Sequence, residues 1–178
     1  MNVYVDLDGT LIRTDLLWEG VRRLAVEQPL AVFLLPVWLM KGRSGLKREV
    51  ARRVAIDPAR LPYRREVLDH LRREREAGRT LILCTAADRV LADRVAAHLG
   101  LFDEVLGTTV GDNLKGARKL AAIERHAGDR GFEYIGDALA DLPIFAKAAK
   151  AIVVAPGLLL RRRLARFGKT VTVLEGRS

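Results

Sequence analysis

The sequence predicts an α/β fold: a three-layer domain built on a parallel sheet, with a small all-helical cap inserted after the first strand. Short apolar runs alternate with longer stretches of helical periodicity along the chain, a pattern typical of parallel strands connected by helices. The first two predicted strands are separated by about 70 residues, far more than one crossover helix requires. This excess length predicts the cap.

Strands are expected where β-branched, aromatic and other apolar residues form short runs. The first strand, Val3–Val5, ends directly before an aspartate, and the second, Thr80–Cys84, is almost continuously apolar, as in a strand buried on both faces. Comparable runs predict four further strands: Glu104–Leu106, Phe132–Ile135, Ala151–Val154 and Val171–Leu174.

Helices are expected between the strands, where apolar residues recur every three or four positions. The segment Asp88–Leu99 has this spacing, and Gly100 follows it as a residue that commonly ends helices. Similar patterns predict four more helices in the core: Arg64–Ala77, Lys115–His126, Leu139–Lys147 and Leu158–Phe167.

The predicted domain organisation is a core of residues 1–14 and 60–178 with a helical insertion of residues 15–59. The insertion follows the first strand, at the sheet edge where open parallel sheets bind ligands. An insertion at this place is expected to act as a cap over the site.

The cap contains a dense apolar run, residues 29–40, directly before the basic segment of residues 41–53. Twelve residues are too few to span a bilayer, which needs about 20. The composition fits a segment at a membrane interface, and it equally fits a cap-core helix interrupted by Pro36. Trp18 and Trp38 either line a substrate chamber or pack in the cap.

The net charge of +9 indicates basic surfaces that face an anionic partner or simply solvated, Arg-rich helices. The chain lacks a basic strand interleaved with aromatic residues, which disfavours nucleic acid as a partner. One cysteine, Cys84, excludes a disulfide framework. The amino terminus does not resemble a secretory signal, so we expect a cytoplasmic protein, with membrane association through the cap as the alternative.

The first motif that points to chemistry is DLDGT at residues 6–10, directly after the first strand. Its two carboxylates leave a buried strand at the sheet edge that forms sites in this fold class. Gly9 allows the backbone to turn sharply and approach a ligand closely, and Thr10 adds a hydroxyl. The alternative interpretation is a simple turn, which an Asp-Gly pair commonly makes.

Further polar residues follow other strands or begin helices on the same edge of the sheet. Thr85 ends the second strand, Lys115 begins a helix, and Asp137 and Asp141 lie one helical turn apart after the fourth strand. Taken singly, these positions could be a core-edge hydroxyl, a surface lysine and a capped helix start. Their order along one sheet edge favours a shared site.

Carboxylates, a hydroxyl and an ammonium group at one edge suit a divalent cation together with a phosphoryl group. Mg²⁺ prefers oxygen ligands and is typically held by one or two carboxylates with a substrate phosphate. It would neutralise charge so that a carboxylate can attack phosphorus. Zinc is disfavoured because His70, His98 and His126 lack the spacing of ligands. We therefore expect Mg²⁺ as the cofactor.

These four motifs together resemble the haloacid dehalogenase-like (HAD) hydrolase superfamily, with the resemblance covering residues 1–156. It implies a Rossmann-like sheet with a helical cap between the first and second motifs. It also implies a phosphatase that hydrolyses a phosphate monoester, in which Asp6 is the nucleophile and forms an aspartyl-phosphate intermediate. Asp8 would be the general acid for the leaving group and then the base for water.

The same resemblance implies the remaining roles. Asp6, the backbone carbonyl of Asp8 and Asp137 would bind Mg²⁺, and Asp141 would support this arrangement. The phosphoryl group would be held by a set of residues from three motifs: Gly9, Thr10, Thr85, Ala86 and Lys115.

A narrower resemblance concerns residues 6–18, the apolar run of the cap and TAADR at residues 85–89. These segments look like the HAD domain often found ahead of a UbiA-type prenyltransferase, a membrane protein that acts on polyprenyl phosphates. The association implies a lipid-linked phosphate as substrate and a contact with a membrane or a prenyltransferase through the cap. Sugar phosphates are the other candidate substrates.

Two other functions are compatible with the same residues. One is a non-catalytic module whose basic cap docks on a membrane or a prenyltransferase; the intact acidic motifs disfavour it, because a scaffold gains nothing from clustered carboxylates. The other is a phosphotransferase that uses Asp6 in the same way but passes the phosphoryl group to an alcohol.

Overall fold

The structure is a computed structural model that describes residues 1–40, 42–109, 114–166 and 171–174. The chain divides into two compact units. One, the core unit, comprises Met1–Arg13 and Pro62–Ser178, and the other, the helical unit, comprises Thr14–Leu61.

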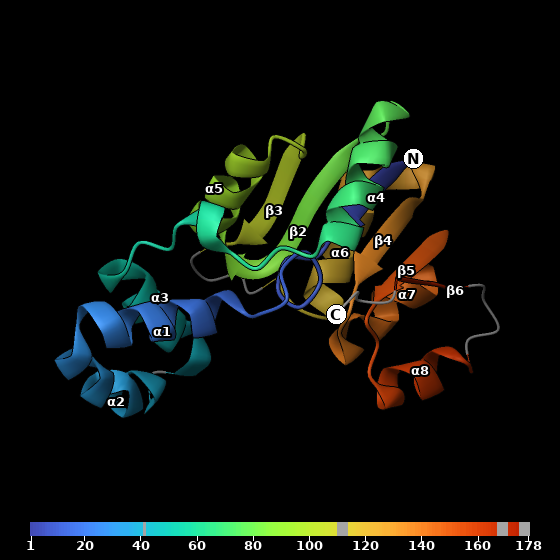
Figure 1. Cartoon of the computed structure of the whole chain (residues 1–178). Helices are drawn as coiled ribbons and strands as arrows, with labels where there is room; N and C mark the ends of the chain where they lie inside the picture. Colours follow the sequence, from blue (N-terminus) through green and yellow to red (C-terminus); the bar gives the residue numbers. More distant parts are fainter. Residues whose placement is uncertain (41, 110–113, 167–170, 175–178) are drawn as a thin grey trace. The chain divides into compact units, whose positions relative to one another are not determined.

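The core unit is built on a six-stranded sheet, and every pair of neighbouring strands is parallel (Figure 1). The strand order is β3-β2-β1-β4-β5-β6. This arrangement confirms the predicted α/β class. The strands are β1 (Asn2–Val5), β2 (Leu81–Asp88), β3 (Glu104–Thr108), β4 (Phe132–Gly136), β5 (Lys150–Val154) and β6 (Val171–Leu174).

The central strands are buried on both faces of the sheet. Val3, Tyr4 and Val5 are fully buried in succession, although neighbouring side chains of a strand point to opposite faces. The same holds for Leu81 to Thr85 in β2. Continuous apolarity is therefore required here, which explains why these runs could be read as buried strands from the sequence.

Helices cover both faces of the sheet. On one face, α6 (Ala117–Ala127), α7 (Leu142–Lys147) and α8 (Leu158–Leu164) pack in one apolar cluster with residues of β1, β2, β4 and β5. The helix α4 (Arg65–Glu76) lies on the opposite face (Figure 1), and α5 (Arg89–Leu99) packs against β2 and β3.

The main elements agree with the predicted ones, and some of their ends differ. Strand β2 continues to Asp88, so Thr85 lies within the strand and not at its end. Asp88 caps α5 by accepting a hydrogen bond from the backbone N–H of Val90 (2.9 Å), as expected of an N-cap aspartate. Helix α6 begins at Ala117, two residues after the predicted start at Lys115.

The helical unit packs around a small core of its own. Leu24, Trp38, Val50 and Val54 form this core, and Gly20 allows α1 to approach α3, since a Cβ at Gly20 would lie 2.6 Å from Val50 Cγ1. The elements are α1 (Leu16–Glu27), α2 (Leu35–Met40), α3 (Gly42–Arg53) and two 3₁₀ helices, η1 (Pro29–Leu34) and η2 (Pro58–Arg60). Within the described residues, every helix is too short or too polar to cross a bilayer.

Candidate active site

The order of the strands determines where in the sheet the candidate site lies. From β1 the chain proceeds outward through β2 to β3, and it then returns to add β4 on the other side of β1. Ligands of open parallel sheets bind at such a reversal, beyond the carboxyl ends of the two strands. Asp6 directly follows β1 and Asp137 directly follows β4, so the two carboxylates leave the sheet at this point.

The backbone after β1 turns at once and brings its residues against β4. The N–H of Asp6 donates to the carbonyl of Ile135 (2.9 Å), and the carbonyl of Gly9 accepts from Nε of Arg64 (3.1 Å). Gly9 has a φ of +76°, and a Cβ at this position would lie 2.1 Å from Oδ2 of Asp137. Only glycine fits a turn of this shape beside that carboxylate.

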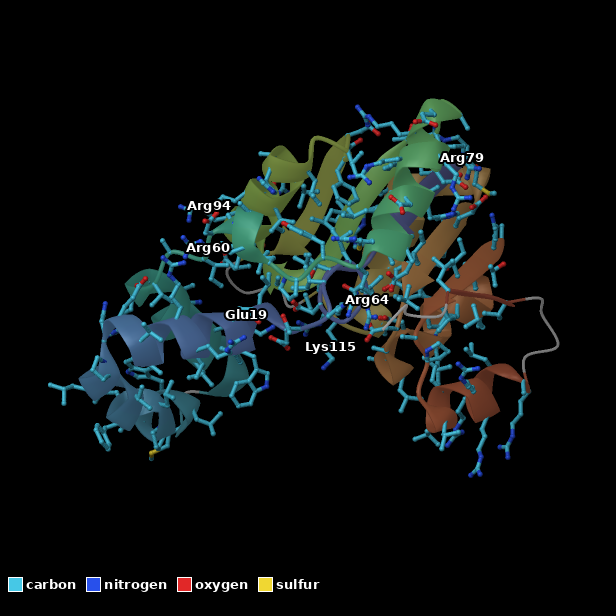
Figure 2. All side chains as sticks on the ribbon, viewed as in Figure 1. Glu19, Arg60, Arg64, Arg79, Arg94 and Lys115 are labelled. Carbon is cyan, nitrogen blue, oxygen red and sulfur yellow. The ribbon has the colours of Figure 1, made fainter. Side chains whose placement is uncertain are left out.

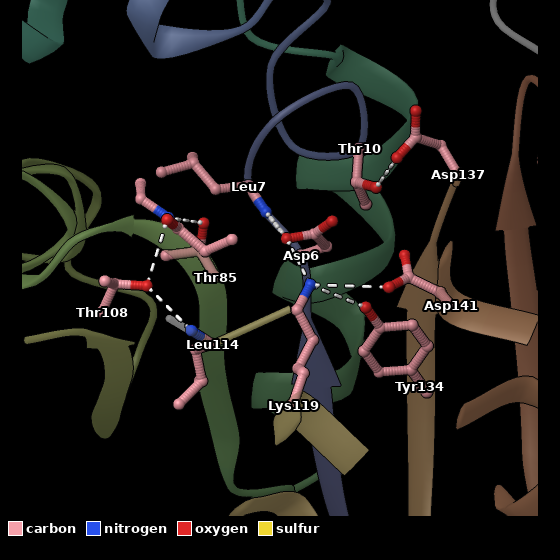
Figure 3. A network of polar contacts seen from close by, with 12 residues as sticks. Asp6, Leu7, Thr10, Thr85, Thr108, Leu114, Lys119, Tyr134, Asp137 and Asp141 are labelled. Atoms are coloured by element: carbon pink, nitrogen blue, oxygen red, sulfur yellow. Dashed lines mark hydrogen bonds and ion pairs between the residues drawn. The ribbon is translucent and has the colours of Figure 1, made fainter. Parts of the chain in front are cut away.

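A buried lysine, Lys119 of α6, lies at the centre of the site (Figure 3). Its Nζ is 2.9 Å from Oδ1 of Asp6 and 3.7 Å from Oδ1 of Asp141. It also donates to the hydroxyl of Tyr134 (3.1 Å). Oδ1 of Asp6 accepts a second hydrogen bond from the backbone N–H of Leu7 (2.9 Å). The Asp6 carboxylate is thus held in one orientation from two sides.

The electrostatics keep this lysine charged. Burial alone would lower the pKa of Lys119, but the adjacent carboxylates of Asp6 and Asp141 outweigh it and raise the pKa above its ordinary value. A permanent positive charge therefore lies beside Asp6 at neutral pH.

Burial, together with nearby negative charge, raises the pKa of each of the other two carboxyl groups. Burial, and then the charge of Asp6, raise the pKa of Asp137 to about 6. Burial also raises the pKa of Asp141 to about 6, because the proximity of Asp6 adds to it although Lys119 acts against it. Both groups would hold their protons less tightly with a further cation nearby.

The geometry of the carboxylates fits a hard divalent cation. Asp6, Asp137 and Asp141 each offer an oxygen atom within 4.8 Å of the others. Mg²⁺ prefers oxygen ligands and is typically held by one or two carboxylates, so this cluster offers enough oxygen atoms of the right kind. The residues present therefore fit the expected metal.

Hydroxyl groups orient the surrounding backbone. Oγ1 of Thr85 accepts from the N–H of Ala87 (3.0 Å). Oγ1 of Thr108 donates to the carbonyl of Ala86 (3.1 Å) and accepts from the N–H of Leu114 (3.1 Å). Figure 3 shows Thr85 on the strand beside Asp6. These hydrogen bonds hold the end of β2, the end of β3 and Leu114 together at the same edge as the carboxylates.

Most of the residues singled out from the sequence lie at this edge, but two of them differ from expectation. Thr10 is fully buried, and its Oγ1 donates to Oδ1 of Asp137 (3.0 Å), so its hydroxyl orients a carboxylate. Lys115 is exposed (Figure 2), and the lysine beside Asp6 is Lys119. Asp8 is half-buried.

The acidic cluster has one carboxylate more than the two that were expected to bind the metal. Asp141, predicted in a supporting role, shares the cluster with Asp6 and Asp137. Among the described residues, the side chain of Asp8 is not part of that cluster. Gly9 and Ala86 remain at the edge of the site, one touching Asp137 and the other held by Thr108.

The residue that sequence reasoning missed, Lys119, carried a detectable signal. Lys119, Ile123 and Ala127 recur every four residues and all three are buried, so they share the inner face of α6. A lysine on the apolar face of a helix requires a buried anion. That requirement distinguishes it from Lys115, which precedes the helix.

Comparisons with known proteins place the chain in a family context. A family model described as haloacid dehalogenase-like hydrolase matches residues 3–146. The uncharacterized protein y4nM of Sinorhizobium fredii (strain NBRC 101917 / NGR234) is 41% identical over 171 residues, which are 96% of this chain and 33% of that protein. The chain thus spans about a third of the length of the curated relative that it matches.

Solved structures share the fold at low sequence identity. A protein of unknown function from Bordetella pertussis Tohama I has a TM-score of 0.69 at 16% identity, and the match covers 97% of both chains. A substrate-bound phosphoserine phosphatase has a TM-score of 0.64 at 15% identity, covering 96% of this chain and 91% of the other. A phospho-aspartyl intermediate analogue of phosphoserine phosphatase has a TM-score of 0.62 at 18% identity, with 90% and 89% covered.

Proposed function

The chain belongs to the haloacid dehalogenase-like hydrolase family, and from this we propose that it is a Mg²⁺-dependent phosphatase that hydrolyses phosphate monoesters through Asp6. The observation that carries the proposal is the ion pair between the buried Lys119 and Asp6, set among two further carboxylates at the reversal point of the sheet. This arrangement supports a covalent mechanism with a carboxylate nucleophile.

In the first step, a carboxylate oxygen of Asp6 attacks phosphorus, and the bond between phosphorus and the leaving alcohol breaks. The hydrogen bond from Leu7 and the ion pair with Lys119 restrict rotation of the carboxylate, so its attacking direction is set before the substrate arrives. Asp8, two residues further on, gives its proton to the oxygen of the leaving alcohol.

In the second step, water attacks the aspartyl phosphate. Asp8, now a carboxylate, takes a proton from this water, the bond between Asp6 and phosphorus breaks, and inorganic phosphate leaves. Both carboxylates return to their starting states, so the cycle balances. The half-buried position of Asp8 is compatible with access to water.

Negative charge that develops on the phosphoryl oxygens needs stabilisation within the site. The ammonium of Lys119 is buried and remains charged, so its effect is larger than that of a solvated lysine. Thr85 supplies a buried hydroxyl on the adjacent strand. We assign to Lys119 the role that the sequence had suggested for Lys115.

Asp6, Asp137 and the backbone carbonyl of Asp8 would hold Mg²⁺, with Asp141 near enough to contribute a fourth oxygen. Bound there, Mg²⁺ would offset the charge that opposes the approach of a carboxylate to a phosphate. Thr10 fixes one oxygen of Asp137 through its hydroxyl, which leaves the orientation of this ligand determined by the chain itself.

The primary test is hydrolysis of p-nitrophenyl phosphate with Mg²⁺, followed by a panel of phosphoserine, sugar phosphates and polyprenyl phosphates. Asp6→Asn removes the nucleophile and is expected to abolish turnover, whereas Asp93→Asn, at an exposed position on α5, leaves it intact. Equal activity of Asp6→Asn and the wild type would refute the proposed nucleophile.

Two further measurements separate the proposal from its rivals. Reduction with borohydride during turnover converts an aspartyl phosphate to homoserine, and mass spectrometry should locate this change at position 6. Added alcohols then distinguish hydrolysis from transfer: a phosphatase releases inorganic phosphate at an unchanged rate, whereas a phosphotransferase diverts the phosphoryl group to the alcohol.

A further inference from the structure

The helical unit contains a stretch that is apolar on its outer side as well as on its inner side. Residues 29–40, which form η1 and α2, include no charged side chain, and their one side-chain hydrogen-bond donor, the indole of Trp38, is buried. A helix on the surface of a soluble unit normally turns polar residues outward. This stretch lacks that outward polar face.

The side chains of this stretch separate into two sets by their spacing. Ala31, Leu35 and Trp38 pack inward against the small core of the unit. The other set, which we call the α2 surface, is exposed. It comprises Leu30 (81% exposed), Phe33 (79%), Leu34 (43%), Val37 (52%) and Met40 (88%). Leu30 and Phe33 lie one turn apart in the 3₁₀ helix η1, and Val37 and Met40 lie about one turn apart in α2, so each pair shares one side of its helix.

An apolar pocket of about 330 Å³ adjoins this surface. Every residue that lines it is apolar, and they include Trp18 and Val21 of α1 and Pro36 and Leu39 of α2. Trp18 is 67% exposed and Leu39 is 52% exposed. Exposed apolar side chains therefore continue around α2 from the α2 surface into the pocket, and monomeric soluble proteins rarely expose a contiguous patch of this kind.

The next helix along the chain is basic. Helix α3 carries Lys47, Arg48, Arg52 and Arg53 against a single acidic residue, Glu49. Glu49 forms an ion pair with Arg53. The guanidinium of Arg53 also lies 4.3 Å from the ring centre of Trp38. Arg48 and Arg52 are exposed. Helix α3 packs directly against α2 (Figure 1), so the basic helix is the neighbour of the helix that carries the apolar surface.

We infer that the α2 surface is a docking site for a lipid bilayer that contains anionic lipids. The apolar side chains enter the boundary between headgroups and acyl chains, and the arginines of α3 lie against the phosphate headgroups. The stretch is too short to cross the bilayer, so the unit rests on one leaflet. A protein partner is a poorer fit, because protein interfaces carry about one hydrogen bond per 100–200 Å² and the exposed side chains of this stretch offer no donor for one.

The two tryptophans give a direct readout, because both of them, Trp18 and Trp38, belong to the helical unit. Vesicles of phosphatidylcholine with phosphatidylglycerol should shift the emission of exposed Trp18 to shorter wavelength, and brominated acyl chains should quench it. A Trp38→Phe variant isolates this signal from the buried ring. Pure phosphatidylcholine should bind much more weakly, since it lacks the net negative charge.

Substitutions then locate the surface. Phe33→Glu and Met40→Glu are each expected to lower the vesicle partition coefficient by about tenfold or more. Val90→Glu introduces the same charge at a side chain of the core unit that is 60% exposed, and it should bind as the wild type does. Far-UV circular dichroism checks that each variant is folded, and Phe33→Ser and Met40→Ser provide milder versions if a glutamate prevents folding.

Three results would overturn the inference. The wild type could fail to bind anionic vesicles, or Phe33→Glu and Met40→Glu could bind as well as Val90→Glu. The protein could also form a dimer in gel filtration that Phe33→Glu dissociates, with no binding to vesicles; a second copy of the chain would then be the occupant. None of these measurements depends on phosphatase activity, so the inference and the proposed function can fail separately.

Discussion

Charge balance around single side chains explains the chemistry proposed for this chain. Lys119 is 3% exposed and contacts Asp6 and Asp141, a burial that would be costly for an isolated ammonium. The carboxylates reduce that cost, and the lysine in turn neutralises only part of their charge. The remaining excess of negative charge makes the cluster a suitable site for a divalent cation, which would in turn offset the repulsion between these carboxylates and a phosphate.

Substitution of Lys115 and of Lys119 provides the sharpest test among individual residues. Lys119→Met removes the charge beside Asp6, and we expect kcat/KM to fall by about 100-fold or more, as when other preorganised stabilising groups are removed. Lys115→Met removes an exposed charge and should leave kcat/KM near the wild-type value. Steady-state kinetics with p-nitrophenyl phosphate decide between them. The opposite ranking would restore Lys115 as the catalytic cation.

The raised pKa of Asp137 predicts how stability depends on pH and metal. The pKa is about 6 in the folded chain against 3.8 for the free side chain, so the folded state binds this proton more tightly. The free energy of unfolding of the metal-free protein should then fall as pH rises from about 4 to about 6, by up to about 3 kcal/mol for this group.

Asp137→Asn removes that titration and provides the matched comparison. In EDTA the variant should melt at a higher temperature than the wild type at pH 7.5, and the difference should shrink at pH 4.5. Mg²⁺ should raise the melting temperature of the wild type at pH 7.5 but not that of the variant. If the melting temperatures of variant and wild type in EDTA differed by the same amount at both pH values, the raised pKa of Asp137 would be contradicted.

Among the elements, the turn after β1 determines whether the carboxylates can meet. It leaves the sheet between β2 and β4, and its glycine lies against Asp137. The conformation of the turn thus holds the DLDGT motif close to Asp137. The hydrogen bond from Thr10 to Asp137 adds to this contact.

A pair of glycines separates backbone strain from steric contact with the site. Gly9 and Gly78 have nearly the same φ, +76° and +74°, but a Cβ at Gly9 would meet Asp137 whereas one at Gly78 would meet no described atom within 4 Å. Both alanine variants should be destabilised by about 1 kcal/mol through strain. Only Gly9→Ala should also lose Mg²⁺ affinity and activity.

Isothermal titration with Mg²⁺ and aryl phosphate kinetics, measured on both variants, check this prediction. Equal metal affinity in Gly9→Ala and Gly78→Ala would show that Asp137 can move aside without loss of the site.

At the scale of the whole molecule, the structure consists of two units with separate apolar cores. The core of the helical unit is small, with Leu24, Trp38, Val50 and Val54 at its centre, whereas the core unit buries the central strands of a six-stranded sheet. Small cores stabilise less, because a smaller fraction of the chain's surface is removed from water. We therefore expect the helical unit to unfold first.

Both tryptophans report on the helical unit, so its unfolding can be followed apart from the rest. On heating, the change in tryptophan emission should precede the main change in far-UV circular dichroism. Val50→Ala should lower the first transition, by creating a cavity in the small core, and Mg²⁺ should raise only the second. Coincident transitions in all conditions would indicate one cooperative unit.

The strands, their parallel arrangement and the polar residues at their ends could be predicted from the sequence because each has a local signature. A strand buried on both faces must be apolar at consecutive positions, as Val3–Val5 and Leu81–Leu83 are. Residues that follow such strands in one direction reach the same edge, so Asp6 and Asp137 could be assigned to one site without coordinates.

Contacts across elements could not be predicted in this way. The choice of Lys119 over Lys115 depends on where α6 begins and which of its faces meets Asp6. The hydroxyl of Thr10 is directed to Asp137 by the turn at Gly9. Local spacing specifies the side of an element on which a residue lies, but the partner of a polar side chain is selected by packing between segments distant in sequence, and that packing exists only in the folded chain.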